Sequence, residues 1–272
     1  MSRLIKSLAV AAAFGITSQA FGVVLVSDNF DTKTLGALVP QSAQVSVAGT
    51  NWDGGGPATV VNTGPVLGTQ SVSSTTASLG AGLESHHSWV DLYVGPATNF
   101  AVPTGFYVNG SVDVLVDAAD TTSIGGLGGW ANGGGNLNGF IGIGNSSIYY
   151  RSGVGIAPTT TIIAPISSIS GLSVNVGGWN KVLLQVEQVD ATTITSRYFV
   201  NGTLIPFTHT RIIAAGNGIS DFDLMNVNGG TVAGGVTVRY DNFLVETVAI
   251  PEPTTLAVLA GAGVLVLRRR RA

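Results

Sequence analysis

Short runs in which apolar and polar residues alternate fill the middle of the chain, and this period of two limits the fold more than any other feature. The clearest runs are KVLLQVEQV from Lys181, TITSRYFV ending at Val200 and GVTVRYDNFLVETV ending at Val248. Successive side chains of a strand point to opposite faces, so the alternation is typical of strands with one buried face. No convincing helical periodicity occurs outside the two chain ends.

An Asn201-Gly202 pair lies between two of these runs and predicts a tight hairpin. Both central residues of a type I′ turn need a positive φ, which asparagine and glycine tolerate. With a second turn near Asp190-Ala191, residues 181–207 are predicted to form three antiparallel strands. Many strands without crossover helices indicate two packed sheets. We therefore predict an all-β fold, an antiparallel β-sandwich over residues 21–248.

Glycine is the most conspicuous residue of the chain, with 38 copies, of which twelve lie in the stretches 125–139 and 229–235. Glycine weakens a strand because it loses more backbone entropy and packs no side chain. Both stretches are therefore predicted to be long loops. The run DFDLMNV is predicted to be a strand, in which Asp221 and Asp223 share one face.

The distribution of charge narrows the function. Half of the twelve basic residues lie at the chain ends, at Arg3, Lys6 and 268–271, together with one acid, Glu252. The body, residues 21–250, therefore has 12 − 6 = 6 basic and 15 − 1 = 14 acidic residues, a balance of −8. An acidic body repels phosphate backbones, so nucleic acid is not expected as a partner.

Cysteine is absent, which excludes disulfides, thiolate metal sites and cysteine nucleophiles. The histidines are His86, His87 and His209. A zinc site needs three or four suitably spaced ligands, so these histidines are predicted to be surface or loop residues.

The N-terminal residues 1–20 have the layout of a secretory signal peptide. A positive segment with Arg3 and Lys6 precedes the apolar run Leu8–Ile16 and a small-x-small site that ends at Ala20. This order predicts a signal helix, export through the Sec machinery and cleavage after Ala20.

The C-terminal residues 249–272 combine a Pro-Glu-Pro triplet, an apolar segment and a basic end. Residues 254–267 form a stretch of fourteen residues without charge, and arginines occupy positions 268–271. A permanent bilayer span needs about 20 residues, so a predicted helix of this length is marginal as an anchor. The arginines are suited to stop transfer on the cytoplasmic side, and a simple membrane anchor stays an alternative.

This tail resembles a PEP-CTERM sorting signal. The resemblance implies export by a Gram-negative bacterium and processing at the inner membrane by an exosortase, with a transient inner-membrane-tethered intermediate. It also implies a final place on the outer surface or in the extracellular matrix, together with exopolysaccharide or biofilm. The residues that match the signal are Pro251, Glu252, Pro253, Arg268, Arg269, Arg270 and Arg271.

The body resembles concanavalin-A-like and laminin-G-like jelly rolls. The matching segments are GWNKVLLQVEQVD with RYFVNGTLI, the closing run RYDNFLVE and the opening run SDNFDTKTLGAL. Related jelly rolls sometimes bind calcium at strand ends, and calcium takes six to eight oxygen ligands. Asp28, Asp31 and Asp241 are the calcium candidates, and no other cofactor is expected. The alternative is that such aspartates, including Asp117 and Asp120, cap turns.

No catalytic constellation stands out in the sequence. The Glu-x-Asp-x-x-Glu strand motif of glucanases with this fold is absent, and so is the Gly-x-Ser-x-Gly elbow of serine hydrolases. Glu84, Glu187 and Glu246 are widely scattered. The chain is therefore predicted not to be an enzyme. The alternative, a glycan hydrolase of the same fold, would rely on Glu187 or Asp223.

Trp130 is the candidate for stacking on a sugar, with Asn132 and the nearby Asn136 and Asn138 as hydrogen-bond partners. A glycine-rich loop with one tucked tryptophan is the alternative. The other tryptophans are predicted to lie in the core or at its edge: Trp52, Trp89 and Trp179. We therefore predict that the chain is an exported surface or matrix protein with a lectin-like sandwich that binds exopolysaccharide. A hydrolase and a purely structural matrix protein are the alternatives.

Overall fold

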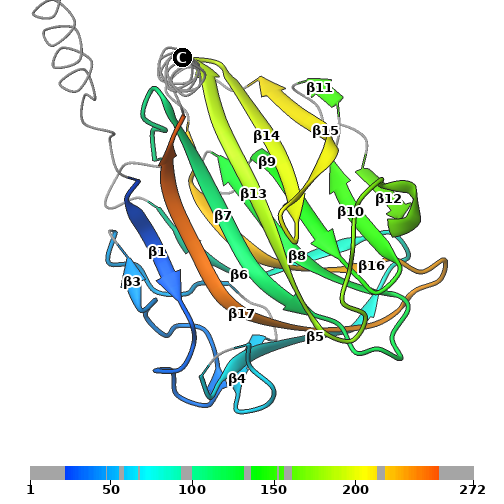
Figure 1. The fold of residues 1–272 in the computed structure, drawn as a ribbon. Helices are drawn as coiled ribbons and strands as arrows, with labels where there is room; N and C mark the ends of the chain where they lie inside the picture. Colours follow the sequence, from blue (N-terminus) through cyan, green and yellow to red (C-terminus); the bar gives the residue numbers. More distant parts are fainter. Residues whose placement is uncertain are drawn as a thin grey trace, which may run out of the picture.

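The computed structural model describes residues 22–46, 48–54, 58–66, 68–92, 100–131, 136–151, 153–155, 161–212 and 218–250. These residues form two sheets that face each other, which confirms the predicted antiparallel β-sandwich (Figure 1). The expected helices of the signal peptide, residues 1–20, and of the C-terminal tail, residues 251–272, lie outside the described residues. Within the described part of the chain, no helix is long and apolar enough to cross a bilayer.

The larger sheet has eleven strands among the described residues, and the closing strand of the chain lies in its middle. Neighbours pair antiparallel except β11 and β15. Its order is β11 (Gly153–Gly155), β15 (Thr203–Ile212), β14 (Thr193–Val200), β13 (Trp179–Asp190), β7 (Phe106–Leu115), β17 (Gly234–Ala249), β5 (Ser71–Leu79), β4 (Ala58–Val61) and β2 (Gly36–Ala37). Two further strands extend from β17: β1 (Val24–Asp28), and β3 (Val45–Ser46), which pairs with β1.

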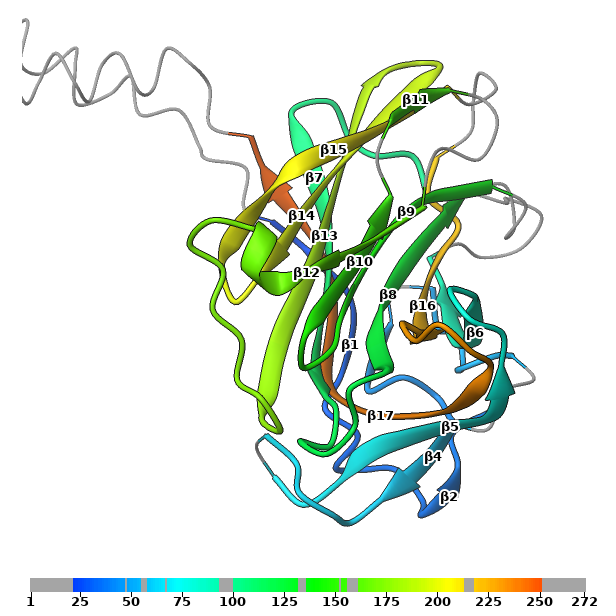
Figure 2. The ribbon, with the colours of Figure 1, turned by 90° about the vertical axis from the view of Figure 1, so that its right-hand side faces the viewer.

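The smaller sheet has six strands among the described residues and lies over the larger one, as Figure 2 shows from the side. Its order is β12 (Thr161–Pro165), β10 (Ser147–Arg151), β9 (Asn136–Ile143), β8 (Ser123–Ala131), β16 (Asp221–Asn228) and β6 (Glu84–Asp91). Strand β16 therefore lies between two strands that precede it by about 100 residues or more in the sequence.

The three predicted strands of residues 181–207 are confirmed as β13, β14 and the start of β15. Asn201 and Gly202 adopt φ of 49° and 77°, as a type I′ turn requires. Alternate residues of β14 are fully buried in the core, including Ile194, Tyr198 and Val200. The alternation read from the sequence therefore identifies the inner face of this hairpin.

The predicted loop over residues 125–139 is wrong, because much of this stretch forms the hairpin of β8 and β9. A side chain on Gly125 would place its Cβ 2.1 Å from a Val238 methyl, and one on Gly129 would lie 3.0 Å from Leu184. The facing sheet occupies the space that side chains on β8 would need. Glycine composition suggested a loop, whereas here it lets the two sheets approach. The second glycine-rich stretch, residues 229–235, is a turn up to residue 233, and Gly234 begins β17.

The same complementarity recurs in the larger sheet at Gly110 of β7. A Cβ on this glycine would lie 2.3 Å from the ring of Phe222, which comes from β16 of the smaller sheet. Phe222 is fully buried. Dense interiors leave no void for a further methyl group, so this ring fixes how closely the sheets approach.

A buried polar network also ties the two sheets together. Asn226 of β16 donates to the Ser74 hydroxyl on β5 at 3.2 Å and accepts from the Tyr240 hydroxyl on β17 at 2.7 Å. All three side chains are fully buried. Burial also raises the pKa of Tyr240 well above its usual value, so the phenol stays protonated and donates. A satisfied polar network in a core favours one register of the sheets over others.

We predict that Gly110→Ala destabilises the fold by about 1–3 kcal/mol, because the new methyl overlaps the Phe222 ring. The control is Gly234→Ala, since no atom lies within 4 Å of a Cβ there; its effect should be within about 0.5 kcal/mol. Urea unfolding of the full-length variants measures both. Equal stability of the two variants would contradict the proposed packing.

Candidate functional site

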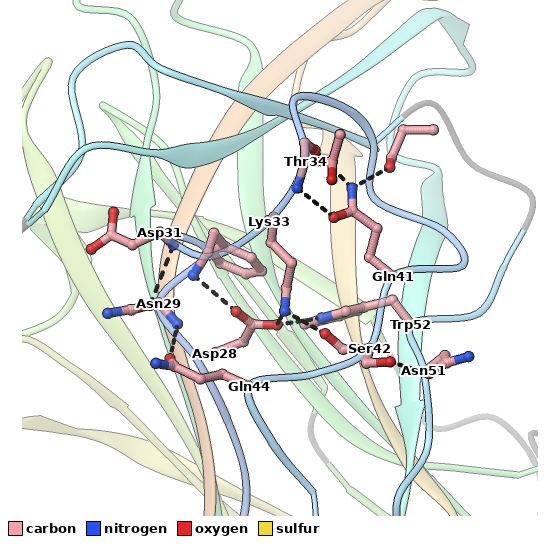
Figure 3. Close-up of polar contacts among 12 residues, drawn as sticks. Asp28, Asn29, Asp31, Lys33, Thr34, Gln41, Ser42, Gln44, Asn51 and Trp52 are labelled. Atoms are coloured by element: carbon pink, nitrogen blue, oxygen red, sulfur yellow. Dashed lines mark hydrogen bonds and ion pairs between the residues drawn. The ribbon is translucent and has the colours of Figure 1, made fainter.

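Asp28, the first calcium candidate, is part of a closed buried cluster at the end of β1 (Figure 3). Its Oδ2 contacts Lys33 Nζ at 2.9 Å and accepts from Trp52 Nε1 at 2.8 Å. Its Oδ1 accepts from the Phe30 backbone N–H at 2.9 Å. A lysine ammonium at this carboxylate takes the place that a cation would need, so Asp28 is not available to calcium.

Asp31 and Asp241 accept hydrogen bonds from the backbone of a neighbouring loop. Asp31 Oδ1 accepts from the backbone N–H groups of Thr69 and Gln70 at 2.7 and 3.0 Å. Asp241, in β17, accepts from the Val66 N–H at 2.8 Å. Among the described residues, no three acidic or histidine side chains gather as metal ligands.

The turn-capping alternative describes Asp117 and Asp120. Asp117 accepts from the Ala119 N–H, and Asp120 accepts from the N–H groups of Thr122 and Ser123. Backbone N–H groups two or three residues along the chain are the usual partners of such capping carboxylates. The calcium site predicted at Asp28, Asp31 and Asp241 is not assembled in the described structure.

The Asp28 cluster predicts a strong effect of Lys33→Met on stability. The substitution leaves a buried carboxylate without its cation, which we expect to cost about 3–5 kcal/mol. Lys181→Met is the matched control, because the Lys181 side chain is 50% exposed although it contacts Asp113 at 3.0 Å. An exposed pair contributes at most about 1 kcal/mol. Denaturant unfolding distinguishes the two, and similar losses would show that the Asp28 cluster does not behave as a buried ion pair.

Two tryptophans and two aspartates share the outer face of the smaller sheet. In the sheet register Trp130 of β8 lies opposite Asp221 of β16, and Trp89 of β6 lies opposite Asp223. Residues directly opposite each other in an antiparallel pair project to the same face. The tryptophans therefore flank β16 from strands about 10 Å apart. We call these four residues the tryptophan platform.

Hydrogen bonds and glycines set the shape of the tryptophan platform. Trp130 Nε1 donates to Asp223 Oδ2 at 2.9 Å, which fixes the indole over the carboxylate. A Cβ on Gly128 would lie 2.2 Å from Asp223 Oδ1, so only glycine leaves room for this arrangement. Both aspartates are buried, whereas both indoles are half-buried. A ligand on this face therefore meets the rings first.

A small apolar cluster borders the tryptophan platform, and Trp130 packs against it. Its rings Phe140 and Tyr149 stack with centroids 4.6 Å apart, and the Arg151 guanidinium lies 5.0 Å above Phe140. Glu84 accepts from the Tyr149 hydroxyl at 2.9 Å and lies 3.5 Å from Arg151. These contacts extend the aromatic character of the face across β9 and β10.

The surroundings of the platform are acidic. Asp91 lies opposite Asp221 at the end of β6, and burial followed by the nearby charge of Asp53 raises its pKa. Asp53 is held there by two backbone hydrogen bonds to Trp89, of 2.9 and 3.1 Å. Four carboxylates around two indoles repel polyanions and can accept hydrogen bonds from hydroxyl groups.

The structure places the sequence-predicted tryptophans in three environments. Trp130 lies in a strand rather than a loop, and Trp52 is fully buried as predicted. Trp89 and Trp179 are half-buried on the outer faces of the two sheets. Asn132 and the side chains of Asn136 and Asn138 lie outside the described residues. The register that brings Trp89 to Asp223 joins distant segments, and no local sequence signal indicates it.

Two further predictions from the sequence concern Glu187 and His209. Glu187 lies on the outer face of the larger sheet, where it pairs with Arg197 at 2.9 Å, so it is on the opposite side of the sandwich from Asp223. The surface position predicted for His209 is wrong, since the side chain is 1% exposed in β15. Burial, with Arg151 and Arg211 nearby, lowers its pKa to about 4. The side chains of His86 and His87 lie outside the described part.

No family model matches the chain, and no curated protein does. Several solved structures are similar at low identity. An endo-β-1,4-glucuronan lyase from the fungus Trichoderma reesei is 16% identical, with a TM-score of 0.43, over 84% of this chain and 95% of that one. An endo-1,3-β-glucanase from Streptomyces sioyaensis is 10% identical, with a TM-score of 0.44, over 86% and 99%. A carbohydrate esterase from Shiga toxin-encoding bacteriophage phi24B is 16% identical, with a TM-score of 0.47, over 83% and 98%.

Proposed function

We propose that this chain is an exported bacterial surface or matrix protein whose sandwich binds a neutral, extended polysaccharide without cleaving it. We also propose that the two sheets form a jelly roll of the concanavalin-A-like kind. One observation carries the binding part: Trp89 and Trp130 flank β16 on a single outer face, with buried carboxylates beneath them.

The ligand class follows from the chemistry of the tryptophan platform. Indole rings offer flat apolar surfaces to the C–H faces of sugar rings, and carbohydrate sites combine such rings with a few oriented polar groups. The tryptophans stand on strands about 10 Å apart, either side of β16, and are offset by two residues along the sheet, so one extended glycan can contact both. A compact small molecule would reach only one of them.

The acidic surroundings favour a neutral glycan over a uronic acid polymer. Asp53, Asp91, Asp221 and Asp223 surround the indoles, and the body has an overall balance of −8. Like charges brought together at an interface cost free energy, which discriminates against anionic chains. The proposed ligand is therefore an uncharged polysaccharide.

The absence of cleavage is supported by the placement of Glu187 relative to Asp223. Glycoside hydrolysis needs two carboxyl groups on either side of one glycosidic bond, about 5–10 Å apart. Glu187 and Asp223 lie on opposite sides of the sandwich. In addition, Asp223 Oδ2 already accepts a hydrogen bond from Trp130 Nε1. The pair on which the hydrolase alternative relies therefore cannot flank one glycosidic bond.

We predict that Trp130→Ala and Trp89→Ala each weaken polysaccharide binding by about 10–100-fold, the range typical of a central aromatic contact. The full-length protein in mild detergent is tested on an array of neutral and uronate-containing bacterial polysaccharides, with isothermal titration for the hits. Phe207→Ala is the control, because it removes a 40% exposed ring from the larger sheet.

Three outcomes would contradict parts of this proposal. If the unmodified protein binds no polysaccharide on the array, a purely structural matrix protein is favoured. Release of reducing sugar ends would establish the glycan-active alternative. Preference for uronate polymers would overturn the neutral ligand.

The sorting proposal rests on the C-terminal sequence, with Pro251, Glu252, Pro253 and the arginines 268–271 read by an exosortase. We expect the intact mass of the protein from its native host to lack everything beyond the Pro-Glu-Pro region. The same chain made in a host without exosortase should keep its tail. A tail retained in both hosts, with the protein in the inner membrane, would make the segment a permanent anchor.

A further inference from the structure

A cavity of about 370 Å³ lies at the end of the sandwich where β7 leaves the larger sheet for the connection to β8. We call it the end cavity. Its lining residues are Leu115, Asp117, Ala118, Asp120, Gly177, Thr237 and Arg239. Pockets of this size hold small ligands or single sugar units of a longer chain.

Arg239 supplies the donor groups of the end cavity. It is half-buried in β17, next to Leu115 in the sheet register, and Leu115 is next to Trp179. No ion pair or hydrogen bond joins the Arg239 guanidinium to another described residue. Trp179 Nε1 donates to the Gly64 carbonyl at 3.1 Å, and Arg239 Nη1 reaches the same glycine. An aromatic ring and an uncommitted guanidinium thus meet at one loop residue.

Two carboxylates supply the acceptors. Asp117 uses Oδ1 for the Ala119 N–H at 2.9 Å, and its Oδ2 makes no hydrogen bond with any described residue. Asp120 is held rigidly by the N–H groups of Thr122 and Ser123 and by the Ser123 hydroxyl. Burial alone would raise the pKa of Asp120, but the hydrogen bonds from Ser123 and Thr122 outweigh it and lower the pKa.

This set of groups selects a neutral polyol over a simple ion. Asp117 and Asp120 repel a free anion, and Arg239 offsets part of their attraction for a free cation. Vicinal hydroxyl groups of a sugar can accept from the guanidinium and donate to a carboxylate at the same time. Leu115 adds an apolar wall for the ring.

The end cavity is far from the tryptophan platform and faces another direction. Ser123 begins β8 beside Asp120, and Trp130 lies seven residues further along the same strand. At about 3.3 Å per residue, that separation is roughly 23 Å. In addition, Arg239 and Thr237 lie on the larger sheet, whereas the platform lies on the outer face of the smaller one (Figure 2).

We propose that the end cavity is a second saccharide-binding site, and that the protein cross-links neutral polysaccharide chains by holding one chain at each site. This inference rests on the proposed function, because the first chain is held by the tryptophan platform. Two sites that face apart on one rigid sandwich engage separate chains, and bivalent contact strengthens a network beyond either single affinity.

The test uses the full-length protein with four soluble neutral polysaccharides: dextran, mixed-linkage β-glucan, galactomannan and xylan. Titration calorimetry with their short oligosaccharides counts the sites, and light scattering with the polymers reports cross-linking. Arg239→Gln should reduce the sites from two to one and abolish the scattering increase, while binding at the platform persists. Trp130→Ala should weaken the other site by about 10–100-fold and also abolish the scattering increase.

Two further variants distinguish the loss of the second site from a loss of the fold. Thr237→Trp fills the end cavity from an exposed strand position and leaves Arg239 in place, so it should reproduce the effect of Arg239→Gln. Arg197→Gln makes the same substitution elsewhere on the larger sheet and should bind and cross-link like the unmodified protein. Thermal melts of every variant verify the fold.

The possible failures are distinct. If Arg239→Gln and Thr237→Trp both keep two sites and full scattering, the second site is overturned while the proposed function stands. If the unmodified protein binds one oligosaccharide and Trp130→Ala removes it, the cross-linking inference also fails. If no oligosaccharide of the four neutral types binds the unmodified protein, the second site and the neutral polysaccharide function fail together.

Discussion

The close approach of the two sheets is the constraint on which the rest of this structure depends. Where one sheet supplies a large side chain, the other supplies a glycine: Gly110 faces Phe222, and Gly129 faces Leu184. Because packed interiors tolerate neither voids nor overlap, these pairs fix the spacing and the register together. Since Gly129 faces inward to Leu184, the alternation along β8 turns its neighbour Trp130 outward.

Buried polar contacts then give this packing a unique arrangement. Asn226 joins β16 to β5 and β17, and the Asp28–Lys33 pair with Trp52 attaches the N-terminal segment to the sandwich. Buried polar groups without partners are costly, so an altered register would lose these contacts along with its apolar packing. The carboxylates that the sequence offers as metal ligands serve the fold in this way.

The proposed function uses the surfaces that remain outside this core. One face carries the tryptophan platform, and the opposite sheet carries the end cavity with Arg239. Few charges and a net acidic body suit hydroxyl-rich, uncharged ligands, which are recognised by ring stacking and oriented hydrogen bonds. A rigid sandwich with two outward sites is the geometry that a matrix cross-linker needs.

Local patterns were sufficient for several features, because alternation and turn chemistry depend only on neighbouring residues. The antiparallel sandwich, the Asn201-Gly202 hairpin and the shared face of Asp221 and Asp223 follow from the sequence alone. Only tertiary structure made strands of the glycines in 125–139, buried His209, paired Asp28 with Lys33 and brought Trp89 to Asp223. These outcomes depend on which distant strands become neighbours, and strand order is decided by long-range packing that no local period records.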